Sequence, residues 1–130
     1  YEEDDGGYAG VALKFIETAQ SGTKGTMIMC IPNDGSIDGL RNDDVVEITC
    51  DVDKNGCTPH RIGKVDEQNL ELIRRVKNYE RLSSKAIRER SRSAAIQALT
   101  LHPLVNSYSI AVKLVDEFIE HNKNYCGGWK

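Results

Sequence analysis

The sequence has no surplus of basic residues and no long apolar run, and these two absences exclude several classes of protein. Its 130 residues carry 17 Lys and Arg against 20 Asp and Glu, a net charge of -3. A domain that binds nucleic acid needs a basic surplus to replace the counterions on phosphates. A membrane-spanning helix needs roughly 20 apolar residues. A secretory signal peptide begins with basic residues, whereas Tyr1 of this chain is followed by the acidic residues Glu2 to Asp5. We therefore expect a cytoplasmic protein with no nucleic-acid or membrane partner.

The common self-contained catalytic motifs are also missing. The chain contains no G-x-G-x-x-G, no P-loop, no G-x-S-x-G and no H-E-x-x-H. Its four cysteines show no C-x-x-C spacing, and its three histidines are not paired at zinc-ligand intervals. We therefore expect that no residue of this chain binds a dinucleotide or a metal ion.

The cysteines are predicted to be free thiols. Cys50 and Cys57 could meet across a hairpin, but without a secretory signal the reducing cytosol disfavours a disulfide. Cys30 and Cys50 lie inside apolar strand-like runs, where a free thiol behaves as a small hydrophobic side chain.

The first half of the chain has the pattern of a helix followed by strands. The expected elements are a helix over 8–19, a buried strand over 26–31, a strand over 45–52 and a return strand over 57–62. Asn55-Gly56 predicts a type I′ hairpin turn, in which both central residues have positive φ, and Pro59 places the return strand at a sheet edge.

From Asp66 onward the apolar period is helical. Asp66 is the expected N-cap of the first of these helices, Ser83 or Ser84 that of a second, and Ser107 or Ser109 that of the last. His102-Pro103 should end the helix before it, because the residue before proline avoids the α conformation. The residues expected to face inward from the last helix are Ile110, Leu114, Val115, Phe118 and Ile119. The fold class is therefore α+β: one helix, a small antiparallel strand cluster and then several helices.

Few polar residues stand out as site candidates. His60 and His121 fit a polar surface, while His102 is expected to bond a backbone group of its own turn. The polar cluster around Lys77 and Glu80 predicts either internal ion pairs or a subunit contact. Tyr8 follows two glycines and has little to pack against locally. It either anchors the first helix or acts as a base, and a base would need a cation or metal from elsewhere to lower its pKa from about 10.

Six segments, taken in order, resemble the C-terminal region of family-4 glycoside hydrolases of the 6-phospho-β-glucosidase type. They are Gly6-Gly7-Tyr8 with Val11-Ala12-Leu13, Pro32 to Ile37, Asp43 to Cys50, Val76 to Leu82, Ala95 to Leu99, and Leu101 to Val105. The resemblance covers nearly the whole chain. It implies that residues 1–130 form a single substrate-side and oligomerisation domain, similar to the C-terminal domain of lactate and malate dehydrogenases, which follows an N-terminal Rossmann domain.

The same resemblance implies an unusual chemistry, in which NAD and a divalent metal such as Mn²⁺ are held upstream of this region. Hydride leaves C3 of the sugar to NAD, a tyrosine matching Tyr8 removes the C2 proton, and the glycosidic oxygen is eliminated. Water then adds, and the hydride returns from the reduced NAD to C3. This differs from hydrolysis by two carboxylates. Asn33 and Gly35 are the expected substrate-binding residues, and the chain alone should be inactive.

The substrate and two alternatives stay open at this point. Acidic Glu3 to Asp5 replace a basic stretch usual before the tyrosine, and Pro32 stands where many relatives carry arginine, so a 6-phosphate is not required by the pattern. The alternatives are the C-terminal domain of an NAD-dependent 2-hydroxy-acid dehydrogenase and a non-catalytic interaction module. The chain is expected to form a homo-oligomer.

Overall fold

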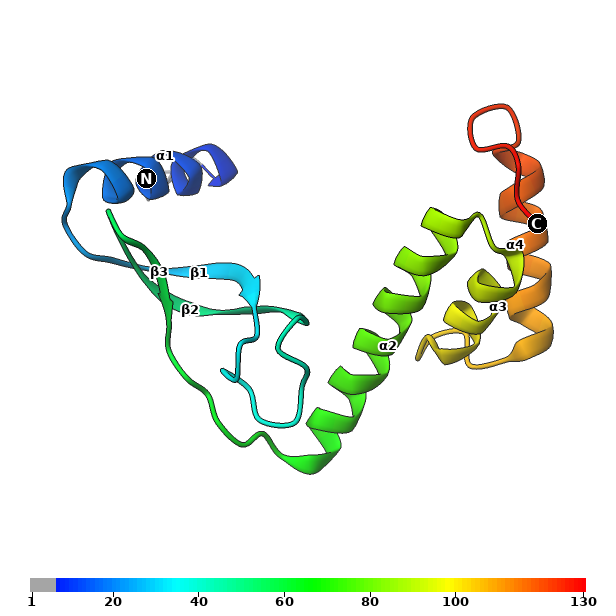
Figure 1. Ribbon diagram of the computed structural model, residues 1–130, viewed down its shortest axis with the longest axis horizontal. Helices are drawn as coiled ribbons and strands as arrows, with labels where there is room; N and C mark the ends of the chain where they lie inside the picture. Colours follow the sequence, from blue (N-terminus) through cyan, green and yellow to red (C-terminus); the bar gives the residue numbers. More distant parts are fainter. Residues whose placement is uncertain (1–6) are drawn as a thin grey trace, which may run out of the picture. The chain divides into compact units, whose positions relative to one another are not determined.

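The computed structural model describes residues 7–130, which form two compact units that meet in sequence between Val65 and Asp66. Unit 1 contains α1 (Gly7–Ser21), β1 (Gly25–Pro32), β2 (Val45–Asp53) and β3 (Gly56–Pro59), and unit 2 contains α2 (Glu67–Glu89), α3 (Arg92–Leu101) and α4 (Tyr108–His121). These elements confirm the α+β class (Figure 1). None of the helices in the described part of the chain is long and apolar enough to cross a membrane.

Unit 1 is a three-stranded antiparallel sheet in the order β1-β2-β3, with α1 in contact with the central strand. Alternate residues of β2 are buried, namely Val46, Ile48, Cys50 and Val52. This alternation is the pattern of a sheet with one covered face. β1 follows it too, because Met27 is buried whereas Ile28 is 65% exposed. The strand expected over 26–31 is therefore present, but it is buried on one face only.

The turn between β2 and β3 differs from the expected type I′ turn. Asp53 pairs with Gly56, so the two central residues are Lys54 and Asn55. Positive φ falls one residue later, at Gly56 with φ 120°. The carboxylate of Asp53 accepts a 2.7 Å hydrogen bond from the backbone N–H of Asn55, which builds the turn around the side chain of Asp53.

Strand β3 lies at the sheet edge, as Pro59 predicted, but it ends there and not at Ile62. The backbone N–H groups of Ile62 and Gly63 both donate to the carbonyl of Ser36, at 2.9 and 3.0 Å. The N–H of His60 still donates to the carbonyl of Thr49 in β2, but from Ile62 onward the segment bonds to the loop that follows β1.

Helix α2 begins as predicted but runs further than expected. Asp66 is its N-cap and accepts from the backbone N–H of Asn69. The helix continues through Ser83 and Ser84, so the expected cap there was wrong, and it ends only at Arg90, which has φ 49°. Serine tolerates a helix interior where the apolar stripe continues, whereas a left-handed residue stops the helix.

The core of unit 2 consists of Ile96 from α3 with Ala111 and Val115 from α4. Ser107 caps α4 and His102 ends α3, as expected. The inward stripe of α4 repeats every four residues from Ala111, which leaves Ile110 51% and Phe118 56% exposed. Ile110 was therefore wrongly expected to face inward, whereas Phe118, although more than half exposed, lines the hollow between α2, α3 and α4.

All four cysteines are free. Cys50 is fully buried in the core of the sheet, and this burial raises the pKa of its thiol, so it stays neutral and packs as a small apolar side chain. Cys30, in contrast, is exposed on the other face of the sheet, because it occupies an outward position of β1.

Candidate functional site

Tyr8 is the second residue of α1, and its side chain is 98% exposed. The helix is attached to unit 1 nearer its other end, where Thr18 is buried and Phe15 is partly covered. Tyr8 therefore does not anchor the first turn within its unit. Its ring is directed to solvent, where a partner surface or a substrate can reach it. The acidic residues before it, Glu3 to Asp5, lie outside the described part of the chain.

Asn33 directly follows β1 and is fully buried. Its side-chain oxygen accepts a 2.8 Å hydrogen bond from the N–H of Ile37, and its side-chain nitrogen donates to the carbonyl of Ile37 at 3.1 Å. The backbone N–H of Asn33 donates to the carbonyl of Asp44 at 2.7 Å, which closes the base of the loop between β1 and β2. The Asn33 side chain thus positions this loop from inside.

Asp34 and Gly35 are the central residues of a tight turn that begins at Asn33. The N–H of Ser36 donates to the carbonyl of Asn33 at 2.7 Å, and the two residues between have φ of 38° and 79°. Positive φ at both central positions defines a type I′ turn. A Cβ built on Gly35 would have no neighbour within 4 Å, so glycine is required for its backbone angle and not for space.

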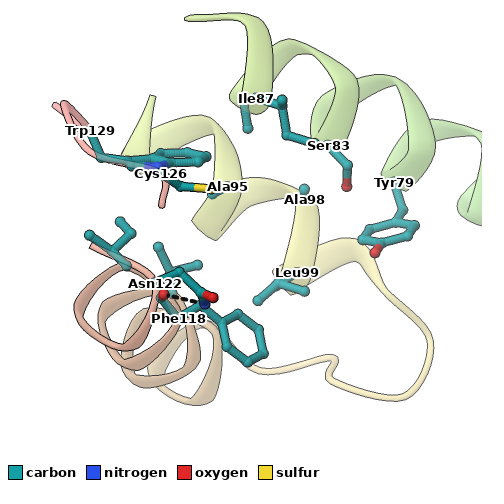
Figure 2. A pocket seen from close by; sticks show the side chains of 13 residues that line it. Tyr79, Ser83, Ile87, Ala95, Ala98, Leu99, Phe118, Asn122, Cys126 and Trp129 are labelled. Atoms are coloured by element: carbon teal, nitrogen blue, oxygen red, sulfur yellow. Dashed lines mark hydrogen bonds between the residues drawn. The ribbon is translucent and has the colours of Figure 1, made fainter. Parts of the chain in front are cut away.

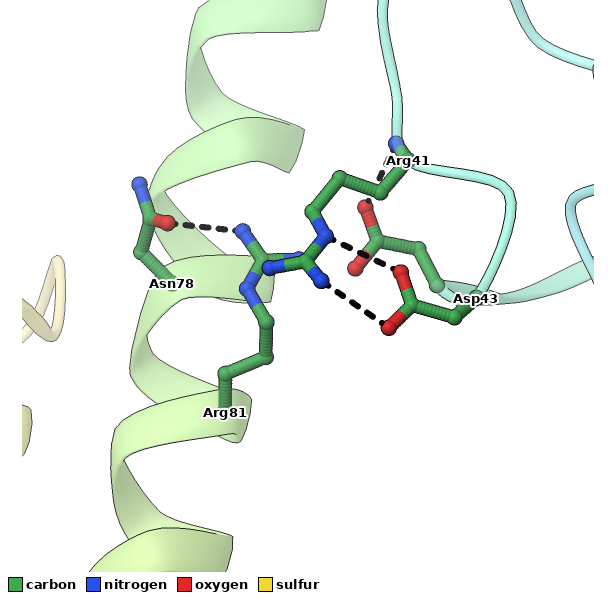
Figure 3. Close-up of polar contacts among 5 residues, drawn as sticks. Arg41, Asp43, Asn78 and Arg81 are labelled. Atoms are coloured by element: carbon green, nitrogen blue, oxygen red, sulfur yellow. Dashed lines mark hydrogen bonds and ion pairs between the residues drawn. The ribbon is translucent and has the colours of Figure 1, made fainter.

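A second set of contacts stabilises the part of the same loop that directly precedes β2. The guanidinium of Arg41 donates to both carboxylate oxygens of Asp43, at 2.9 and 3.1 Å (Figure 3). The backbone N–H of Arg41 donates to the carboxylate of Asp44, which is 5% exposed. Sequence reasoning missed this arrangement, although Arg-Asn-Asp-Asp directly before a strand is a detectable turn signal.

Ser36 and Ile37 join the loop to the segment after β3. The carbonyl of Ser36 accepts from Ile62 and Gly63, and Ile37 forms an isolated parallel bridge with Gly63. Asn33 and Gly35 are therefore brought together in one braced turn, while Tyr8 lies on a different element of the same unit.

Several polar residues of unit 2 contact one another. Lys77 forms an ion pair with Glu80 at 2.7 Å, and the guanidinium of Arg81 donates to Asn78 at 2.7 Å (Figure 3). The ring of Tyr79 meets His102 edge to face, with centroids 4.6 Å apart. Nδ1 of His102 accepts from the backbone N–H of Leu104 at 3.2 Å, which confirms the predicted bond to its own turn.

Residues 7–130 contain no group of three or more His, Cys, Asp or Glu side chains that could hold a metal ion. Chemically, the described residues supply the exposed phenol of Tyr8 and one braced turn.

Comparison with known proteins identifies the family. Residues 1–105 match the family 4 glycosyl hydrolase C-terminal domain. Maltose-6′-phosphate glucosidase MalH of Clostridium acetobutylicum is 36% identical over 99 residues, which are 76% of this chain and 22% of that protein. The 6-phospho-beta-glucosidase BglT of Thermotoga maritima is 35% identical over 118 residues, which are 91% of this chain and 28% of that protein.

Solved structures agree. A 6-phospho-alpha-glucosidase from gut microorganisms, in complex with NAD and glucose-6-phosphate, matches 95% of this chain and 28% of its own, with 30% identity and a TM-score of 0.88. The Thermotoga maritima 6-phospho-beta glucosidase with NAD and glucose-6-phosphate matches 92% of this chain and 29% of its own, with 34% identity and a TM-score of 0.84. The chain spans about a quarter of the length of the curated relatives it matches. It belongs to family 4 of the glycosyl hydrolases, in which it corresponds to the C-terminal domain.

Proposed function

We propose that the chain is the C-terminal part of a larger glycosidase that hydrolyses 6-phospho-glucosides with NAD and a divalent metal, and that it is inactive by itself. The observation that carries this is the match to phospho-glucosidases along nearly the whole chain, with a TM-score of 0.88 to a relative bound to NAD and glucose-6-phosphate. A related structure holds NAD and Mn²⁺.

The relatives favour a phosphorylated glucoside as the substrate and leave its anomer open. Enzymes named for β-linked and for α-linked substrates match this chain at 35% and 30% identity. A domain shared by both must serve a step that does not depend on the configuration at C1. Removal of the proton at C2 is such a step, because C2 is unaffected by which face the aglycone occupies.

In this proposal Tyr8 is the base that takes the C2 proton. Its exposure leaves the hydroxyl accessible to a sugar that the rest of the protein would hold. NAD and the metal would be held by that other part, because residues 7–130 contain no metal-ligand group and the sequence has no G-x-G-x-x-G. NAD supplies an acceptor for the hydride, and the metal supplies positive charge beside the oxidised carbon.

Asn33 and Gly35 would contribute to substrate binding in different ways. The Asn33 amide is occupied by Ile37, so we propose that it positions the turn and does not contact the sugar itself. Gly35 has open space beside its Cα, so a sugar could approach its backbone closely.

The partners in this account are an N-terminal dinucleotide-binding domain of the same protein and further copies of the protein. Residues 1–130 would act together as the substrate-side and oligomerisation domain. Light scattering on the longer protein tests the second partner, since a monomer at every concentration would contradict a homo-oligomer.

The activity test uses the longer protein with NAD, Mn²⁺ and a reductant. The substrates are p-nitrophenyl glucoside and its 6-phosphate, in both anomers. We expect cleavage of the 6-phosphates only, dependent on both cofactors and lost in Tyr8→Phe. Tyr125→Phe is the matched control, because Tyr125 is also exposed (88%) and loses the same hydroxyl. Cleavage without NAD or metal, or an unaffected Tyr8→Phe, would overturn the proposal.

A further inference from the structure

Unit 2 contains an apolar pocket of about 320 Å³ that belongs neither to the loop nor to Tyr8. It lies between α2, α3 and α4, and it is completed by the segment after α4 (Figure 2). Its floor is made of short side chains from two helices, Ala86, Ala95 and Ala98. Because these residues end at Cβ, facing helices leave a hollow that leucine would fill.

The lining gives the pocket its chemical character. No Asp, Glu, Lys or Arg lines it, and larger apolar side chains such as Leu99 and Phe118 form its walls. The polar groups are few. Ser83 contributes a hydroxyl, Tyr79 a phenol, and Asn122 an amide whose nitrogen donates to the carbonyl of Phe118 at 2.8 Å. A pocket of this size with apolar walls and a few polar groups is typical of a small-molecule site.

The chain end closes one side of this hollow. Trp129 lies at one end of the pocket, and Tyr79 at the other (Figure 2). The backbone of Lys130 fixes Trp129 there, since its N–H donates to the carbonyl of Arg90 at 2.9 Å and its carbonyl accepts from the N–H of Arg92 at 2.7 Å. These two hydrogen bonds thus attach the segment that carries Trp129 to the junction between α2 and α3.

We propose that this pocket binds a small, uncharged, aromatic or aliphatic molecule, with Trp129 as its end wall. The absence of charged lining residues matches an uncharged ligand, and the volume matches one of moderate size. Burial of such a molecule removes apolar surface of both ligand and pocket from water, which is the driving force for binding. The site is independent of glycosidase activity.

A small molecule fits these features better than a helix from a partner does. A docked helix needs a groove that continues for several turns. Here the hollow has a volume of about 320 Å³, which is less than a helix of several turns occupies. Insertion of a side chain from a second copy is the competing outcome, and the experiment separates the two.

The probe is N-phenyl-1-naphthylamine, which is uncharged and aromatic, added to the 130-residue chain. Trp129 is the one tryptophan of the sequence, so energy transfer from tryptophan to the probe reports binding beside it. We expect saturable transfer at one probe per chain. Ala98→Leu should weaken binding about tenfold or more by filling the floor. Gln97→Leu is the control, because it adds the same side chain on the exposed side of α3.

A second readout needs no substitution. Cys126 and Cys30 are both exposed, but Cys126 lines the pocket whereas Cys30 lies in unit 1. The probe should slow maleimide labelling of Cys126 and leave that of Cys30 unchanged, as measured by peptide mass spectrometry. The proposal is overturned if no energy transfer occurs, or if both leucine variants bind equally. It is also overturned if light scattering shows a dimer in which Cys126 is protected without the probe.

Discussion

The side chain of Asn33 shows why site residues in this chain could be located but not assigned by sequence. The family resemblance marks Asn33 as a substrate-binding residue, and the sequence places it correctly in a turn directly after β1. Its burial depends on Asp44, eleven positions later, whose carbonyl accepts the N–H of Asn33 and closes the loop. Such a closure is a tertiary contact, which local patterns do not reveal. The same holds for Tyr8, because the sequence does not say which end of α1 the sheet covers.

We predict that Asn33→Ala lowers the free energy of unfolding by about 2 kcal/mol, because it leaves the partly buried N–H and carbonyl of Ile37 without their partner. Urea unfolding followed by far-UV circular dichroism measures this. Asn42→Ala, at an exposed position of the same loop, should change stability by less than about 0.5 kcal/mol. Equal effects of the two changes would show that Asn33 does not hold the loop.

A second residue-scale prediction concerns acid stability. The guanidinium of Arg92 donates to both oxygens of Asp116, at 2.6 and 2.9 Å, and this bonding lowers the pKa of the Asp116 carboxyl. A group whose pKa is lower in the folded state contributes stability above its unfolded pKa, about 3.9, and loses it as pH falls through the folded value. Asp116→Asn should therefore reduce the loss of stability on acidification below about pH 4.

The measurement is urea unfolding at a series of pH values from neutral to acidic. Glu117→Gln removes the same charge from the neighbouring residue of α4 and serves as the control. If Asp116→Asn and wild type lose stability in parallel, the pair between α3 and α4 does not contribute.

At the scale of elements, apolar periodicity and capping residues predicted most of the helices and strands. The errors occur at helix ends for which the sequence offers more than one capping residue. Ser83 and Ser84 are good caps, yet α2 passes through them because its apolar stripe continues to Ala86. The helix breaks at Arg90, where Ser91 then caps α3 by accepting from the N–H of Ala94 at 3.2 Å. Which serine caps a helix is therefore decided by packing.

This break gives a matched pair of substitutions. Ser91→Ala should destabilise unit 2 by about 1 kcal/mol, because the first turn of α3 loses its cap. Ser93→Ala, two residues on and exposed within the helix, should be neutral or slightly stabilising, because alanine is the better helix former. The fluorescence of Trp129 during urea unfolding reports unit 2. A Ser93→Ala variant less stable than Ser91→Ala would contradict the capping assignment.

At the scale of the whole molecule, the two units divide the properties of the chain between them. Unit 1 carries Tyr8 and the braced turn, and unit 2 carries the apolar pocket with Trp129. Neither contains a metal-ligand group among the described residues. Since the relatives are about four times as long, the proposed active site is completed by residues that this chain does not include. The ordered motifs of the sequence revealed the family. The residues that would hold NAD and the metal in the proposed enzyme could not be predicted, because no motif within this chain matches them.

The central claim is that Tyr8 removes the C2 proton of a 6-phospho-glucoside in the longer protein. It is tested most directly by comparing substrate that carries deuterium at C2 with ordinary substrate, with NAD and Mn²⁺ present. The account predicts slower turnover of the deuterated substrate and loss of turnover in Tyr8→Phe, while Tyr125→Phe behaves as wild type. Equal rates for the two substrates together with an active Tyr8→Phe variant would contradict it.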